Sequence, residues 1–157
     1  MGLDMHLYRR EYVGGWEWKT VETDGREKAL YDNIIEYLGV DSVEASPHAY
    51  VDVCVAYWRK ANQVHKWFCD LDGGRDECQD ILVPRDKLIE LRELCLSVIR
   101  QPVSAVDTLP TQPGFFFGSY EYDEWYMEDL KLTVKQLNAI LDSTKDVWVD
   151  FIYRASW

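Results

Sequence analysis

The sequence lacks a long apolar run, a Lys/Arg-rich tract and a paired cysteine motif. No window approaches the roughly 20 apolar residues that cross a bilayer. The opening MGLDMHLYRR does not have the order of a signal peptide, in which charge precedes an apolar run. We therefore expect a cytoplasmic protein that does not bind membranes, with Cys54, Cys69, Cys78 and Cys95 as reduced thiols.

Basic residues are scarce compared with acidic ones, 17 against 28, and the formal net charge is −11. A field of this sign repels polyanions, and no basic stripe offers a track for phosphates, which disfavours general nucleic-acid binding. The same charge favours rapid encounter with a basic protein partner.

Aromatic residues are abundant, at 14% of the chain with seven Trp. A chain of 157 residues with 47% apolar residues is long enough to bury one core without metals or disulfides. We therefore predict a single globular domain over residues 1–157. Large amphipathic rings are also frequent at binding surfaces, and a homodimer is compatible with their excess.

Alternating apolar residues mark both ends of the chain: Leu3, Met5 and Leu7 near the start, and residues 147–157 at the end. Weaker strand patterns cover residues 16–21, after a turn at Gly14-Gly15, and 49–55. Helical periodicity covers about 27–38, 57–69, 84–101 and 122–142, and Gly39 stands where a left-handed C-terminal cap belongs. This order predicts an α+β fold, with a small antiparallel or mixed sheet that includes both terminal strands and packs against about four helices.

The stretch VAYWRKANQVHKWF, residues 55–68, is the densest in groups that both stack and hydrogen-bond. A helix from Tyr57 to Cys69 would have two neighbouring faces. One carries Trp58, Asn62, His65 and Cys69, and the other carries Tyr57, Ala61, Val64 and Phe68. The second face is apolar and is expected in the core, so the first is the candidate wall of a cleft.

Arginines lie beside aromatic rings in three places, Tyr8-Arg9-Arg10, Trp58-Arg59 and Tyr153-Arg154. Arg provides a planar fork for phosphate, and aromatic faces stack on bases. If these segments converge, they form a pocket for a nucleotide-like ligand. The predicted ligand-binding residues are Trp58, Arg59, Asn62, His65, Arg9, Arg154, Phe116 and Ser119. The alternative is that these pairs are surface cation–π contacts that stabilise the fold.

No complete catalytic, cofactor or metal motif is present. His65, Cys69 and Cys78 are soft ligands, but a structural zinc site needs a fourth, for which the sequence has no clear source. His65 and Cys69 also lack a third residue to orient a nucleophile. The acidic segment 70–80 is read as a solvated loop rather than a calcium loop. We predict no catalytic residue, no metal and no cofactor.

The chain resembles a family of small uncharacterised proteins of tailed bacteriophages and prophages. The resemblance rests on MGLDMHLYRR, AYWRKANQVHKWF, LPTQPGFFFGSYEYDEWYMEDL and the ending YRASW. It implies an accessory protein expressed in the host bacterial cytoplasm, and it carries no established reaction or catalytic residue.

The leading functional expectation is a non-enzymatic protein that sequesters a nucleotide-derived immune signal, of cyclic or ADP-ribose type, and so counters host defence. One alternative is an acidic inhibitor that binds a host enzyme. A further alternative is a nucleotide-cleaving enzyme with His65 as general base.

Overall fold

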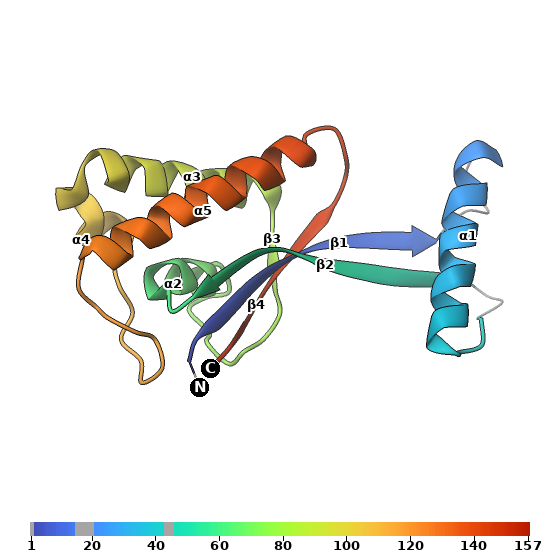
Figure 1. The fold of residues 1–157 in the computed structure, drawn as a ribbon, viewed down its shortest axis with the longest axis horizontal. Helices are drawn as coiled ribbons and strands as arrows, with labels where there is room; N and C mark the ends of the chain where they lie inside the picture. Colours follow the sequence, from blue (N-terminus) through green and yellow to red (C-terminus); the bar gives the residue numbers. More distant parts are fainter. Residues whose placement is uncertain (1, 15–20, 43–45) are drawn as a thin grey trace. The chain divides into compact units, whose positions relative to one another are not determined.

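The computed structural model describes residues 2–14, 21–42 and 46–157. The elements in chain order are β1 (Asp4–Gly14), α1 (Val21–Leu38), β2 (His48–Arg59), α2 (Asn62–Leu71), β3 (Ile81–Val83), α3 (Arg85–Arg100), the 3-10 turn η2 (Pro102–Ser104), α4 (Ala105–Thr108), α5 (Glu124–Ser143) and β4 (Asp150–Ser156). The strands form an antiparallel sheet in the order β2-β1-β4-β3 (Figure 1). The predicted α+β class is confirmed, as is a sheet that includes both terminal strands.

Contacts divide the chain into two units, Met1–Arg9 with Val53–Trp157 and Arg10–Asp52. The prediction of one domain over residues 1–157 stays a prediction. In the part of the chain that the structure describes, no helix is long and apolar enough to cross a bilayer.

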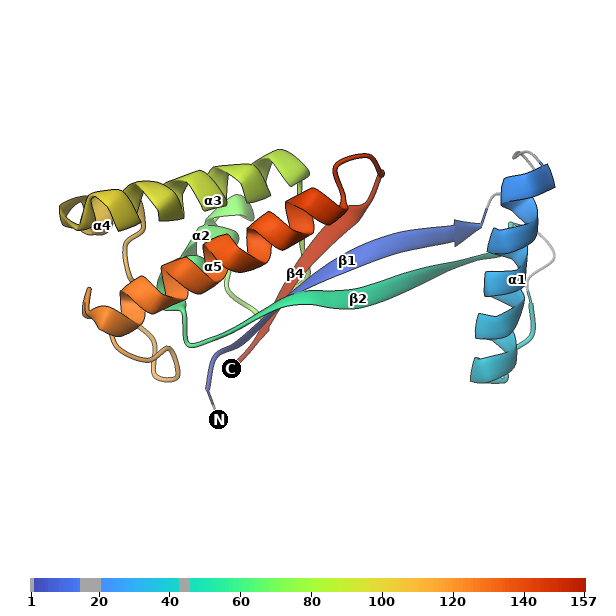
Figure 2. The same cartoon turned by 45° about the horizontal axis from the view of Figure 1, so that its top comes forward.

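The core of the larger unit lies between its part of the sheet and the helices. Leu3, directly before β1, and Met5 and Leu7 on β1 are alternating side chains and are fully buried. On β4, Phe151 and Tyr153 are 1% exposed. Helices α3 and α5 run antiparallel, side by side, in both views (Figures 1 and 2).

Helix α5 follows its predicted bounds closely. Asp123 is the N-cap, and its carboxylate accepts a hydrogen bond from the Tyr126 backbone N–H at 3.0 Å. The buried stripe that follows is Tyr126, Leu130, Thr133, Leu137, Ile140 and Leu141. The buried stripe of α3 is Leu88, Leu91, Cys95 and Val98. The predicted helices at 84–101 and 122–142 are confirmed.

The prediction of a helix from Tyr57 to Cys69 is wrong at its start. Strand β2 continues to Arg59, and α2 begins only at Asn62. The strand ends where the Lys60 backbone N–H donates to the Leu3 carbonyl at 2.8 Å, with Lys60 at φ +60°. Strand alternation therefore turns Ala56 and Trp58 into the core and leaves Tyr57 42% exposed, the reverse of what was predicted for Tyr57 and Trp58. The other residues predicted for the core face are buried as expected: Ala61, Val64 and Phe68.

The smaller unit comprises the outer parts of β1 and β2 with α1. Arg10 donates two hydrogen bonds of 2.7 Å to the carboxylate of Asp52 and lies 5.5 Å from the ring centre of Tyr50. Gly39, at φ +63°, ends α1 in the left-handed conformation predicted for it. The helix begins at Val21, earlier than predicted, so the last residue of the predicted strand 16–21 is helical. Residues 16–20 of that predicted strand lie outside the described residues.

Candidate functional site

A cavity of about 340 Å³ opens in the larger unit where β2 ends, beside α2, α5 and the segment before α5. Its described lining residues are Arg59, Lys60, Gln63, Gly118, Ser119, Glu121, Asp123, Trp125, Tyr126 and Asp129. The volume falls within the range of small-molecule sites. The lining combines two cations, three carboxylates and an indole, so it offers charge of both signs and an aromatic face.

The cations come from the end of β2. Arg59 and Lys60 are both exposed, and Lys60 adopts a left-handed backbone conformation that turns the chain toward α2. Gly118, at φ +90°, packs against this turn, and a Cβ at that position would lie 3.1 Å from the Lys60 Cβ. Glycine therefore permits the close approach of the two segments that carry Lys60 and Ser119.

Asp129 is partly buried, and burial raises the pKa of its carboxyl group to about 6. The Gln63 side-chain N–H donates to its Oδ2 at 3.3 Å, which partly opposes the rise. Trp125, one residue into α5, is 77% exposed. A carboxylate in this setting favours a ligand that donates hydrogen bonds, and the exposed indole favours one with a flat face.

Asn62 is not among the described lining residues, but it hydrogen-bonds to the loop that forms one wall of the cavity. Its side-chain amide is 1% exposed and donates to the carbonyls of Phe117, at 3.0 Å, and Ser119, at 2.7 Å. Its Oδ1 accepts the backbone N–H of Gln112 at 3.0 Å. One buried side chain thus fixes three points of the loop that carries Gly118 and Ser119.

His65, also 1% exposed, is enclosed in a second hydrogen-bond network. Its Nδ1 lies 2.7 Å from the hydroxyl of Tyr153, and its Nε2 lies 3.0 Å from Oδ1 of Asp76. Asp76 also accepts from the indole N–H of Trp157 at 3.1 Å and from the Gln112 side chain at 3.1 Å. Burial lowers the pKa of His65, and the nearby Asp76 opposes that shift.

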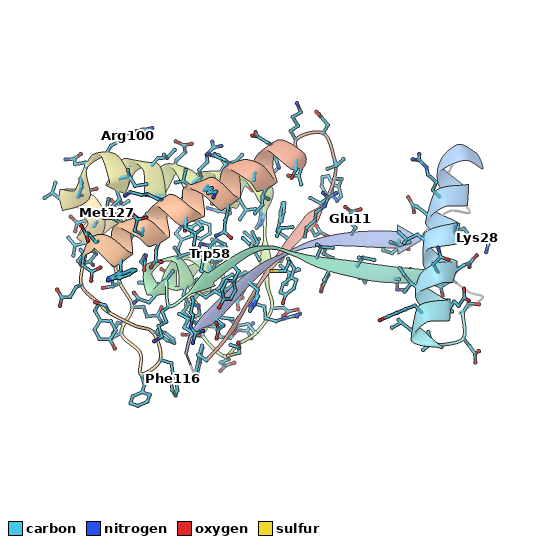
Figure 3. All side chains as sticks on the ribbon, viewed as in Figure 1. Glu11, Lys28, Trp58, Arg100, Phe116 and Met127 are labelled. Carbon is cyan, nitrogen blue, oxygen red and sulfur yellow. The ribbon has the colours of Figure 1, made fainter. Side chains whose placement is uncertain are left out.

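Trp58 is a core residue, 1% exposed (Figure 3). Its indole N–H donates to Oγ1 of Thr133 on α5 at 2.9 Å, so both the ring and its polar group are engaged. The cavity therefore includes Arg59 but not the neighbouring Trp58 among its described lining residues.

The other predicted residues are spread over the larger unit. Of the three arginines, the described cavity lining contains Arg59 but neither Arg9 nor Arg154. Arg154 donates two hydrogen bonds of 2.6 Å to Asp80 and lies 5.2 Å from the ring centre of Tyr8. Phe116 packs partly against the core, and its carbonyl accepts the Leu3 N–H at 3.1 Å. The structure thus brings Arg59 and Ser119 together; a role for the others in binding stays a prediction.

Sequence reasoning missed Lys60, Gln63, Trp125 and Asp129 as lining residues. Trp125 carried a usable signal, since an indole in the first turn of a helix, two residues after an Asp N-cap, lies outside the buried stripe of α5. Asp129 carried a weaker one. It is a charged residue directly before the buried Leu130, and only the fold shows what it faces.

A second cavity, of about 350 Å³, is more apolar and lies beside β3 and the segment before β4. Its lining includes Leu82, Val147 and Trp148, and Trp148 is 95% exposed. Among the described residues, one group has the composition to hold a metal ion: the donor atoms of His65, Cys69 and Asp76 lie within 4.8 Å of one another.

Comparison with protein-family models, with curated proteins and with solved structures found no match to this chain. Functional inference therefore depends on the geometry of the two cavities and of the buried polar groups.

Proposed function

We propose that this protein binds a nucleotide-derived ligand in the cavity lined by Arg59, Lys60, Ser119, Trp125 and Asp129. The observation that supports the proposal most is the combination of two adjacent cations, an exposed indole and a partly buried carboxylate around one space of about 340 Å³. A nucleotide has a matching group for each: an anionic phosphate, a flat base, and hydrogen-bond donors on the ribose and the base.

The cations suit the phosphate. Arg59 provides a planar fork of N–H donors for two phosphate oxygens, and Lys60 provides a second, more mobile positive charge. Because the whole chain carries a net charge of −11, these two local cations are needed to offset repulsion of an anionic ligand.

The opposite wall suits the rest of a nucleotide. The Trp125 ring offers a stacking face, and base–aromatic stacking contributes about 1–3 kcal/mol per base. The carboxylates of Asp123 and Asp129 accept hydrogen bonds from ribose hydroxyls or base N–H groups. Ser119 and Gln63 add groups that both donate and accept.

Binding without cleavage is favoured over catalysis by the placement of the potential reactive groups. The Cys69 thiol is 3% exposed and is not among the described residues that line the cavity. His65 is enclosed by Tyr153 and Asp76 rather than placed in the cavity lining. Sequestration of an intact ligand therefore fits these residues better than hydrolysis.

The resemblance to phage and prophage proteins adds a biological context. In it, the proposed ligand is a cyclic or ADP-ribose-type signal of host defence, and the site of action is the host bacterial cytoplasm. The rival function, inhibition of a host enzyme through the acidic surface, requires no small ligand.

The test is a binding panel of cyclic dinucleotides, cyclic mononucleotides and ADP-ribose derivatives, measured by thermal shift and then by calorimetry. Ligand is recovered after heat denaturation and identified by mass spectrometry. Recovery of intact ligand supports the proposal, whereas a cleaved product indicates an enzyme. No binding across the panel contradicts the proposal and leaves the protein-inhibitor function.

Arg59→Ala and Trp125→Ala test the location of the site. Each is expected to weaken binding by at least tenfold, because each removes a charge contact or a stacking face worth more than about 1.4 kcal/mol. The matched controls are Arg100→Ala and Trp148→Ala, exposed residues outside the cavity lining that are expected to leave the affinity unchanged.

A further inference from the structure

The buried group of His65, Cys69 and Asp76 has donor chemistry that the proposed nucleotide site does not use. His65 and Cys69 lie one turn apart on α2 and are 1% and 3% exposed. Asp76 comes from the loop that follows α2, and its side chain is 19% exposed. The three side chains offer nitrogen, sulfur and oxygen, which are the ligand atoms that Zn²⁺ takes from proteins.

Two of the separations are close to those in a tetrahedral zinc site. Nε2 of His65 lies 3.0 Å from Oδ1 of Asp76 and 3.6 Å from Sγ of Cys69. Metal–ligand bonds of 2.0–2.3 Å at tetrahedral angles imply N···O and N···S separations of about 3.4 and 3.6 Å. The histidine–carboxylate separation therefore needs to open by only a few tenths of an ångström to admit an ion.

The thiol needs a larger adjustment. Sγ of Cys69 lies 3.8 Å from Nδ1 of His65, nearly as close as to Nε2, so it stands beside the ring rather than on the axis of the Nε2 lone pair. Rotation of the short Cys69 side chain about its Cα–Cβ bond moves Sγ without moving the helix backbone.

The surrounding hydrogen bonds are those that hold metal ligands in place. With an ion on Nε2, the other ring nitrogen of His65 carries a proton and donates it to the Tyr153 hydroxyl, 2.7 Å away. The second carboxylate oxygen of Asp76 already accepts from the Gln112 side chain at 3.1 Å. Tyr153 and Gln112 therefore orient the two ligands without occupying their metal-facing atoms. The Trp157 indole N–H also donates to Oδ1 of Asp76 at 3.1 Å, so the ion would share that oxygen with this donor.

Electrostatics at the thiol favour a cation. Asp76, Asp70 and Asp72 place negative potential at the Cys69 sulfur, and Lys66 opposes them more weakly than Asp76 and Asp70 do. A divalent ion gains from this potential and replaces the thiol proton, which leaves to solvent.

We propose that His65, Cys69 and Asp76 bind one Zn²⁺ ion, with water as the fourth ligand on the partly exposed side of Asp76. The site ties the end of α2 to the following loop. Through Gln112 it also supports the segment that carries the wall of the nucleotide cavity. It does not depend on the proposed nucleotide binding.

The test uses a background variant in which the two exposed thiols, Cys54 and Cys78, are replaced by serine, so that Cys69 and Cys95 remain. This chain is freed of metal with a chelator and titrated with Co²⁺. The expected result is saturation at one equivalent, with the intense absorption of a cobalt–thiolate bond. Zn²⁺ should displace the Co²⁺ and, at about 100 times its Kd, raise the Tm by about 5–10 °C.

Single substitutions then locate the site. Cys69→Ala should abolish the thiolate absorption, and Asp76→Asn should weaken Zn²⁺ binding by more than tenfold. Cys95→Ala, which removes the other buried thiol, should retain both properties. Absence of one-equivalent binding, or an absorption that survives Cys69→Ala, overturns the proposal and leaves the three residues as a hydrogen-bonded network only. Circular dichroism of the metal-free variants checks that each is folded. If Asp76→Asn is not folded, the cobalt absorption of Cys69→Ala alone decides whether the site binds metal.

Discussion

Replacement of Asp129 by Asn should stabilise the protein at neutral pH. Asp129 lies on the wall of the nucleotide cavity, where burial raises its pKa from 3.8 to about 6. In the unfolded chain the carboxyl titrates near its ordinary value of about 3.9. The folded state therefore bears a cost for the ionised carboxylate, and an amide of the same shape removes that cost.

The sign and the pH window follow from linkage. Well below the unfolded-state pKa of about 3.9 the carboxyl is protonated in both states and contributes no difference. As the pH rises from about 4 to 6, the carboxyl of Asp129 ionises in the unfolded chain but stays largely protonated in the folded protein. The free energy of unfolding therefore falls over this pH range and stays lower above it. A shift of about two pKa units corresponds to about 3 kcal/mol, which solvent screening at this partly exposed site reduces to about 1–2 kcal/mol.

The assay is urea unfolding of the original protein and of Asp129→Asn at pH 4, 5, 6 and 7.5. The variant should be more stable by about 1–2 kcal/mol at pH 7.5, and the difference should shrink toward zero at pH 4. Asp142→Asn, at an exposed position near the end of the same helix, is the control and should change stability by less than about 0.5 kcal/mol at each pH. An Asp129→Asn variant that is less stable at pH 7.5, or equally shifted at every pH, would refute the reasoning.

Two further substitutions probe the framework of the site. Asn62→Ala removes three hydrogen bonds to the loop before α5 and should lower the free energy of unfolding by about 2–4 kcal/mol, with faster amide exchange in that loop. The control Asn138→Ala, at an exposed position, should lower it by less than about 0.5 kcal/mol in the same unfolding experiment. Trp58→Phe leaves Thr133 without its indole donor and shrinks a fully packed ring, so it should lower the free energy of unfolding by about 1–3 kcal/mol, whereas Trp148→Phe should leave it nearly unchanged. If either variant and its control lowered the free energy of unfolding equally, the packing described would be contradicted.

The elements that the sequence predicts well are those fixed by local pattern. Helix α5 begins at an Asp N-cap and has a continuous apolar stripe. In β4 the alternate residues Phe151, Tyr153 and Ala155 are buried, although Ile152 between them is buried as well. The spacing of the apolar residues in α5 fits the period of a helix, and that in β4 fits the period of a strand. Gly39 was predictable for a similar reason, because a glycine directly after an apolar stripe is the usual end of a helix.

The stretch that joins β2 to α2 could not be predicted in this way. Trp58, Asn62 and His65 are spaced as neighbours on a helix, yet Trp58 belongs to a strand. The boundary is set by a hydrogen bond from Lys60 to the carbonyl of Leu3, a residue that is remote in sequence. Local spacing has no information about such a partner.

Which residues come together at the site could be predicted only in part, for the same reason. Arg59 and Ser119 were predicted as binding residues from their chemistry, and both line the cavity. Asp76 was not predicted as a partner of His65, because the two side chains meet only after the loop that follows α2 folds back. Arg154 has the chemistry of a phosphate ligand but pairs with Asp80. Residue type can be read from the sequence, whereas convergence depends on long-range packing.

The most direct test of ligand binding in this cavity is nuclear magnetic resonance of the indole N–H groups during a nucleotide titration. The signals of Trp125 and Trp148 are assigned from their Phe variants. Binding in the cavity predicts that the Trp125 signal shifts in a saturable manner while the Trp148 signal stays in place. A ligand that shifts Trp148 alone, or a panel that shifts neither, would contradict the central claim.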